Sequence, residues 1–225
     1  MARPASLKKK VYEALRKQIV SGQFAGGTRL TEVAMAASLS VSRTPVREAL
    51  QRLSQERLIV TIPKAGYMVE DLSDDDIQDL FSTRMAVEAI AVEKAVQNMT
   101  VEEFKAMDTN LEKTGAAVKS AAEWQLTELD LEFHTLIYTA ARSRSLFRIC
   151  KNLGDVTLKY RHSLNQSPAR QNQILQQHID IYQAMLSRNA DLAIQAMAHH
   201  GEKARNHLVT IMKKLRSDRF STELY

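Results

Sequence analysis

The chain from residue 73 onward carries apolar residues at the three- and four-residue spacing of amphipathic helices, and it shows no strand pattern. Short polar segments interrupt the spacing at Asn98/Thr100, Ser120, Ser143/Ser145, Gln166-Ser167-Pro168 and Arg188-Asn189. They predict six helices, over residues 74–97, 101–119, 122–141, 146–164, 169–187 and 190–215. Helices with short connections bury their apolar stripes against one another. We therefore expect an antiparallel all-α bundle.

The first part of the chain has a different order of elements. A helix is predicted over residues 7–21, with Val11, Leu15, Ile19 and, less well aligned, Leu7 on one stripe. Thr31 and Ser42 stand where two further helices begin, the second running to about residue 55 with a proline in its first turn. Two extended pieces follow, at 58–62 and 67–69, with a turn between them. This order predicts a winged helix-turn-helix.

The predicted architecture is mainly α, with an N-terminal winged helix-turn-helix domain over residues 1–72 and a helical domain over residues 73–225. Charge is distributed unevenly between them. Residues 1–72 hold twelve Lys and Arg against six Asp and Glu, a net charge of +6, whereas the rest of the chain has a net charge of −1. This asymmetry favours a polyanion-binding N-terminal domain, although a chance excess of charge on a solvated face would look the same.

Composition excludes several classes of protein. Seven Gly and four Pro are too few for a β-sandwich or barrel with many turns, and a single Cys excludes a disulfide framework or a Cys-based zinc finger. No apolar run is long enough for a membrane helix, and the N-terminus does not resemble a secretory signal. We expect a cytoplasmic protein in a reducing compartment, with no membrane partner.

The segment from Ser42 to Leu50 carries the pattern expected of a DNA-reading helix. Arg43 and Arg47 offer two guanidinium groups on consecutive turns, and Ser42 and Thr44 add hydroxyls. A helix in the major groove presents its N-terminal side chains to base edges, where arginine pairs bidentately with guanine. An ordinary surface helix is the alternative, but two arginines one turn apart repel each other unless a polyanion lies between them.

Polar groups interrupt the apolar stripes of three bundle helices. One stripe holds Asp130 and His134 a single turn apart, a second holds His178, and a third holds His200 and, further along, His207. Burying such groups without partners costs a few kcal/mol each. One carboxylate and three imidazoles are a ligand set for a first-row divalent metal. The alternative is that each histidine is a core imidazole hydrogen-bonded to a backbone carbonyl.

The N-terminal motifs resemble those of the GntR superfamily of bacterial transcription regulators. The similarity is carried by LRKQIVSGQFAGGTRL, SVSRTPVREALQRL and KAGYMV, from about residue 7 to residue 69. It implies that Arg43, Thr44 and Arg47 contact DNA, with further contacts from the wing at Lys64 and at Gly66, whose backbone would approach the minor groove. The sequence departs from the family pattern at Ser40 and Arg57, where glycine is usual, and at Lys64-Ala65, which replaces a more basic pair.

The helical part resembles the FCD effector domain of the FadR-type branch of this superfamily, over about residues 74–215. LFSTRMAVEAIAVEKA, DLEFHTLIYTAA and QHIDIYQAMLSRNADLAIQAMAHH carry this similarity. Its metal-binding members have four ligands that match Asp130, His134, His178 and His200. The resemblance implies one divalent transition metal per chain, zinc first, with nickel or manganese also compatible, and a small organic acid as effector. For Arg84 two roles are open: contact with the effector cavity, or a salt bridge with Glu88.

We therefore expect a homodimeric transcription regulator, more a repressor than an activator, that binds a pseudo-palindromic operator in double-stranded DNA and responds to the effector. Two other functions compete with this one. A purely architectural DNA-binding protein would use its bundle only to dimerise. A helical metal hydrolase would use the same Asp and His residues, but the chain has no HExxH motif, phosphate-binding glycine loop or nucleophile elbow.

Overall fold

The computed structural model describes residues 7–20, 23–56, 58–70, 73–120, 123–164 and 167–222. The chain forms two compact units, and the main division between them falls between Leu72 and Ser73. Each unit has its own hydrophobic core. They are therefore described one at a time.

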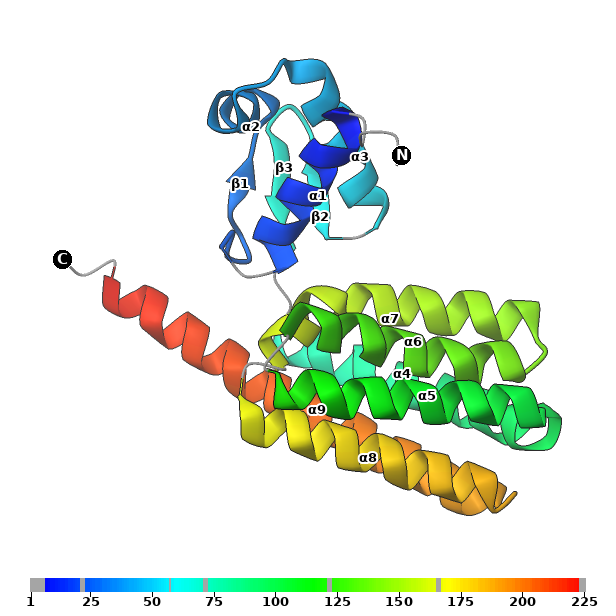
Figure 1. The fold of residues 1–225 in the computed structure, drawn as a ribbon. Helices are drawn as coiled ribbons and strands as arrows, with labels where there is room; N and C mark the ends of the chain where they lie inside the picture. Colours follow the sequence, from blue (N-terminus) through cyan, green and yellow to red (C-terminus); the bar gives the residue numbers. More distant parts are fainter. Residues whose placement is uncertain are drawn as a thin grey trace. The chain divides into compact units, whose positions relative to one another are not determined.

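The first unit is a winged helix-turn-helix, as predicted (Figure 1). Its elements in chain order are α1 (Leu7–Val20), β1 (Arg29–Leu30), α2 (Glu32–Leu39), α3 (Arg43–Gln55), β2 (Ile59–Ile62) and β3 (Gly66–Val69). The three strands form an antiparallel sheet in the order β1-β3-β2. Strand β1 was not expected, because two residues are too few to show alternation.

The core of this unit lies between α1, α3 and the sheet. Val11, Leu15 and Ile19 of α1 are buried, and so are the apolar residues on the inner face of α3. Leu7 is 55% exposed, so its expected place on the stripe was wrong. Each four-residue step rotates the stripe by about 40°, because a helix has 3.6 residues per turn. Two such steps carry Leu7 away from the core.

A polar contact fixes α1 against the end of α3. The Tyr12 hydroxyl lies 2.7 and 2.8 Å from the two carboxylate oxygens of Glu56 and donates to them, while the Arg52 guanidinium stacks 3.9 Å over the Tyr12 ring. Burial and the adjacent Glu56 carboxylate raise the pKa of Tyr12 to about 12. The phenol therefore stays a donor, and the contact holds the recognition helix in one orientation.

The second unit is a helical bundle (Figure 1), and its described residues form six helices, the number that was predicted. They are α4 (Asp74–Asn98), α5 (Val101–Lys119), α6 (Glu123–Ala140), α7 (Arg144–Leu164), α8 (Pro168–Leu186) and α9 (Ala190–Thr222). Ser73 and Thr100 begin α4 and α5 with capping boxes, and Ser167 caps α8. Helix α9 continues beyond the predicted residue 215. None of the described helices is long and apolar enough to cross a membrane.

Helix α4 packs against α6 and α9, and α8 packs against α5 and α9. Their shared core is apolar over most of its length, from Val92 and Phe133 to Ile181 and Met197. Among the described side chains of α9 beyond residue 203, Ala204, Leu208 and Met212 are buried, whereas His207 is only half-buried. The expected stripe through His207 and Ile211 was therefore offset by one residue.

Ser40, which stands where the resembled family usually has glycine, has a strained backbone conformation. Ser40 ends α2 in the left-handed conformation, with φ 54° and ψ 43°. This region is strained for residues with a Cβ and free for glycine. We expect Ser40→Gly to stabilise the winged unit by about 1 kcal/mol, measured by chemical denaturation.

Ser38→Gly is the matched control, because Ser38 is exposed inside the same helix. This variant should lose about 0.5 kcal/mol from reduced helix propensity. Equal effects of the two substitutions would show that the conformation of Ser40 carries no strain.

Candidate functional site

The structure presents the predicted DNA-reading residues on one exposed face of α3. Arg43, Thr44 and Arg47 are exposed, while Val46, Ala49, Leu50 and Leu53 of the opposite face are buried. Ser42 occupies the N-cap position, but its side chain makes no capping hydrogen bond. Ser42 therefore stands at the expected N-cap position without capping the helix through its side chain. Its exposed hydroxyl is available to a binding partner.

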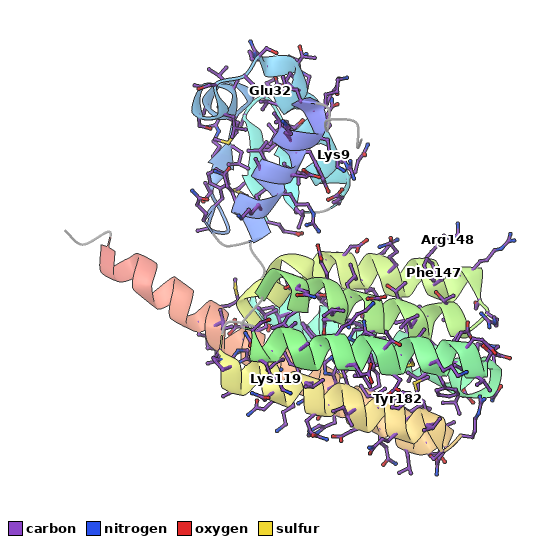
Figure 2. All side chains as sticks on the ribbon, viewed as in Figure 1. Lys9, Glu32, Lys119, Phe147, Arg148 and Tyr182 are labelled. Atoms are coloured by element: carbon purple, nitrogen blue, oxygen red, sulfur yellow. The ribbon has the colours of Figure 1, made fainter. Side chains whose placement is uncertain are left out.

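Glu32, which is labelled in Figure 2, lies at the start of α2 and forms ion pairs with both arginines. Arg47 donates from Nε and Nη2 to the two carboxylate oxygens at 2.8 and 2.9 Å, and Arg43 donates from Nη2 at 3.3 Å. Hydrogen bonds from Arg47 and then Arg43 lower the pKa of Glu32. The sequence argument from repulsion missed this acid, which lies far from both arginines in the chain. Their spacing alone therefore does not require a polyanion.

The wing is the turn between β2 and β3. Lys64 is exposed at its tip with φ 60°. Gly66 has φ 95°, and a Cβ there would lie 2.8 Å from the backbone oxygen of Leu30. The sheet itself therefore requires glycine at this position. Arg29 donates from Nε to the Ala65 carbonyl at 2.7 Å, which adds a cation to the wing that the sequence motifs did not indicate.

In the bundle, the four predicted metal ligands come together from three helices. Asp130 and His134 lie on α6, His178 on α8 and His200 on α9, and all four are buried. One potential ligand atom from each residue lies within 4.8 Å of the others. His178 Nε2 is 3.4 Å from Asp130 Oδ1. The periodicity argument therefore selected residues that are neighbours in space.

Neighbouring side chains orient two of the imidazoles. His200 Nδ1 is 3.0 Å from the amide oxygen of Gln177, which can only accept, so Nδ1 carries the proton and Nε2 is left as a metal ligand. His134 Nδ1 lies 3.5 Å from Glu88 Oε1. Burial, followed by neighbouring cations and imidazoles, lowers the pKa of His200, and burial is also the main cause that lowers the pKa of His134. Both rings are therefore neutral, which is the form that binds metal.

Three residues around the cluster were not found from sequence. Phe133 stacks on His178 with ring centroids 4.0 Å apart, and Gln177 and Tyr138 complete the surroundings. Tyr138 and Arg84 both donate to Glu88, the latter from Nε at 2.9 Å. Phe133 and Gln177 each directly precede a ligand in the chain, and that adjacency was the only available signal.

Arg84 forms the salt bridge with Glu88 that was one of its two open roles. Both residues are buried, and Glu88 lies between Arg84, Tyr138 and His134. Burial alone would raise the pKa of Glu88, but the Arg84 guanidinium, the nearby His134 ring and the hydrogen bond from Tyr138 hold it below its usual range. A carboxylate kept ionised behind His134 favours a proton on Nδ1 and a free electron pair on Nε2.

The cluster fits a divalent transition metal. His134 Nε2 is buried and has no hydrogen-bond partner among the described residues, which is costly unless an ion or water binds it. The ligand atoms of a tetrahedral ion with bonds of about 2.1 Å lie about 3.4 Å apart, so groups that lie within 4.8 Å of one another need to close by at most about 1.4 Å. Such an ion with one carboxylate and three neutral imidazoles keeps one positive charge, which attracts a further anion.

A small cavity adjoins this cluster. Its volume is about 10 Å³, and it is lined by Thr114, Leu126, Asp130, Gln171, Ile174 and His178. That space corresponds to about one water molecule. A bound organic acid would therefore require the helices to separate at this point.

Comparison with known proteins gives two family matches. The FCD domain matches residues 79–203, and the family described as "Bacterial regulatory proteins, gntR family" matches residues 7–69. The first covers the metal-ligand cluster, and the second covers the recognition helix and the wing. Neither match depends on the geometry described above.

Named relatives and solved structures agree with these matches. The gluconate operon transcriptional repressor of Bacillus subtilis is 30% identical over 86% of this chain and 81% of its own length. The HTH-type transcriptional repressor RspR of Escherichia coli is 28% identical over 95% of this chain and 93% of its own. The structure of E. coli McbR/YncC has a TM-score of 0.74 at 23% identity, over 92% of this chain and 99% of that one, which shows a shared fold.

We expect protein purified without chelator to contain about one transition metal per chain and His178→Ala to contain none, measured by elemental analysis.

Gln177→Ala should bind Zn²⁺ about 10- to 100-fold more weakly, because it frees the His200 ring to rotate. The affinity is measured by competition with a chromogenic chelator.

Gln176→Ala is the matched control, since Gln176 precedes Gln177 but hydrogen-bonds Asp180 on the exposed face of α8. Its zinc affinity should equal that of the wild type. Absence of metal from both the wild type and His178→Ala would remove the metal centre and leave the histidines as a metal-free pocket.

Proposed function

The chain belongs to the FadR-type branch of the GntR family of bacterial transcription regulators, and we propose that it is a homodimeric repressor controlled by an organic acid. It is a regulator and not an enzyme, so the hydrolase alternative is wrong. The observation that carries the proposal is the buried cluster of Asp130, His134, His178 and His200. A bundle that only dimerised would have no need to bury these groups.

In this proposal residues 1–72 bind DNA and residues 73–225 bind the effector and dimerise. Two recognition helices, one from each chain, enter successive major grooves of a pseudo-palindromic operator. Arg43 and Arg47 read base edges, Ser42 and Thr44 contact the backbone or bases, and Lys64 and the backbone at Gly66 contact the DNA at the wing. Support comes from the exposure of these side chains and from the relatives that are named repressors.

In this proposal, Glu32 competes with DNA for the guanidinium group of Arg47. Arg47 exchanges a bidentate carboxylate for a guanine edge when it binds, and both partners match its planar fork. The ion pair is exposed and worth little by itself, so the exchange costs little. The ion pair keeps the Arg47 side chain in one extended conformation before DNA binds, rather than free to rotate.

In the bundle, the metal would bind Asp130, His134, His178 and His200 and would supply a positive centre for a carboxylate of the effector. Helix α4 connects this site to the rest of the chain. It begins directly after the winged unit in sequence, and its Glu88 lies 3.5 Å from His134. We infer that separation of the helices around a bound acid shifts α4 and so changes how the two winged domains are held.

For the DNA-reading role, we expect Arg47→Ala to weaken binding about 10- to 100-fold, because it removes a bidentate base contact. The measurement is a gel-shift titration on a duplex selected from a random pool with wild-type protein. Thermal stability should stay near that of the wild type, since the Glu32 pair is exposed.

Arg144→Ala is the charge-matched control, because Arg144 is exposed on the bundle. It should bind the selected duplex as the wild type does, and light scattering should show two chains per particle for both variants. Unchanged binding by Arg47→Ala would contradict the assigned role of α3.

For the effector role, we expect at least one of acetate, lactate, succinate and gluconate to raise the melting temperature of metal-loaded protein and to change its affinity for the selected duplex. Gluconate is included because a relative is named for the gluconate operon. His178→Ala should show neither response. An architectural protein would show no change in DNA affinity with any acid, and that outcome would replace the proposal.

A further inference from the structure

Arg170 is a buried cation with an unused binding edge. It lies in the first turn of α8 and is only 7% exposed. Its Nη1 is 3.4 Å from Gln173 Oε1, a long hydrogen bond. Its Nε and Nη2 are buried and, among the described residues, have no hydrogen-bond partner. No described carboxylate pairs with it.

The location makes this charge more costly. The N-terminus of a helix carries a partial positive charge, which disfavours a cation in the first turn. Burial lowers the pKa of Arg170, and Arg170 contributes, after burial, to lowering the pKa of His207 on α9. An uncompensated buried cation is strongly destabilising, so a protein keeps one only where a partner stabilises it.

The unused edge identifies the partner's chemistry. Nε and Nη2 form one side of the guanidinium fork, and this side binds carboxylate or phosphate through two parallel hydrogen bonds. The adjacent residue, Gln171, and Ile174 one turn later line the small cavity together with Asp130 and His178. Eight residues of helix separate Arg170 from His178, a rise of about 12 Å. One small molecule can therefore lie along α8 between the two.

We propose that Arg170 is a second anion-binding subsite of the effector pocket, so that the effector carries two acidic groups, one at the metal and one at Arg170. The inference rests on the proposed function for the metal end only. Each end of the pocket has a single positive charge, and a dianion neutralises both. Thr114 and Gln171 offer polar contacts to the part of the molecule in between.

The test measures binding of acetate, succinate, glutarate and adipate to metal-loaded full-length protein by calorimetry. We expect one of the three dicarboxylates to bind more tightly than acetate. Arg170→Gln should weaken that dicarboxylate about 10- to 100-fold and leave acetate unchanged. Arg148→Gln, which removes an exposed arginine from α7, should change neither affinity.

A second variant separates a ligand-binding arginine from a structural one. Arg170→Met removes the uncompensated charge and keeps the buried volume, so the free protein should melt at a higher temperature while the dicarboxylate preference is lost. A lower melting temperature, or a dicarboxylate preference that survives in Arg170→Gln, would overturn the proposal.

The two proposals fail in different ways. If the wild type holds no metal but succinate, glutarate or adipate still binds and Arg170→Gln abolishes it, the subsite stands and the metal centre falls. If metal is present and Arg170→Gln binds every acid as the wild type does, the metal centre stands and the subsite falls.

Discussion

Four polar side chains lie in the interior of the bundle, and each of them needs a hydrogen-bonding or ionic partner there. Asp130, His134, His178 and His200 converge from α6, α8 and α9 at a point where an ordinary bundle would place leucine. Desolvation removes the hydration of each group, so each needs a partner inside the protein. The surrounding contacts follow from this need. Gln177 orients one ring, Glu88 lies behind another, and Phe133 stacks on a third.

Glu88 connects this centre to a buried ion pair with Arg84. It accepts from Arg84 and Tyr138 and lies beside His134, so a single carboxylate links α4 to α6. Breaking such a pair leaves an uncompensated charge, which makes the contact rigid. In the proposed function, a change at the metal would be transmitted to α4 through the Glu88 carboxylate.

The arginines of the winged unit and those of the bundle differ in how their charges are paired. In the winged unit, Glu32 pairs with Arg43 and Arg47 at an exposed surface, where in the proposed function a DNA phosphate or guanine would replace it at little cost. In the bundle, Arg84 has an internal partner, whereas the Nε–Nη2 edge of Arg170 has none among the described residues. A carboxylate of the protein paired with Arg170 would compete with a bound ligand for the guanidinium group. Displacing that carboxylate would be costly, because charge interactions are stronger in the low-dielectric interior.

Much of the molecule could be predicted from the sequence because its periodicity is strong. Helical spacing gave six bundle helices and placed the four ligands on inward stripes, and the order of elements gave the winged helix-turn-helix. Strand β1 has too few residues to show a pattern, and the drift of a helical stripe misplaced Leu7 and His207. The sequence offered the Arg84–Glu88 pair as one of two roles for Arg84, but it did not predict the approach of Glu88 to His134, the pairing of Glu32 or the surroundings of Arg170. Periodicity states which face of a helix points inward, but only packing decides which helix meets that face and whether a charge finds a partner there.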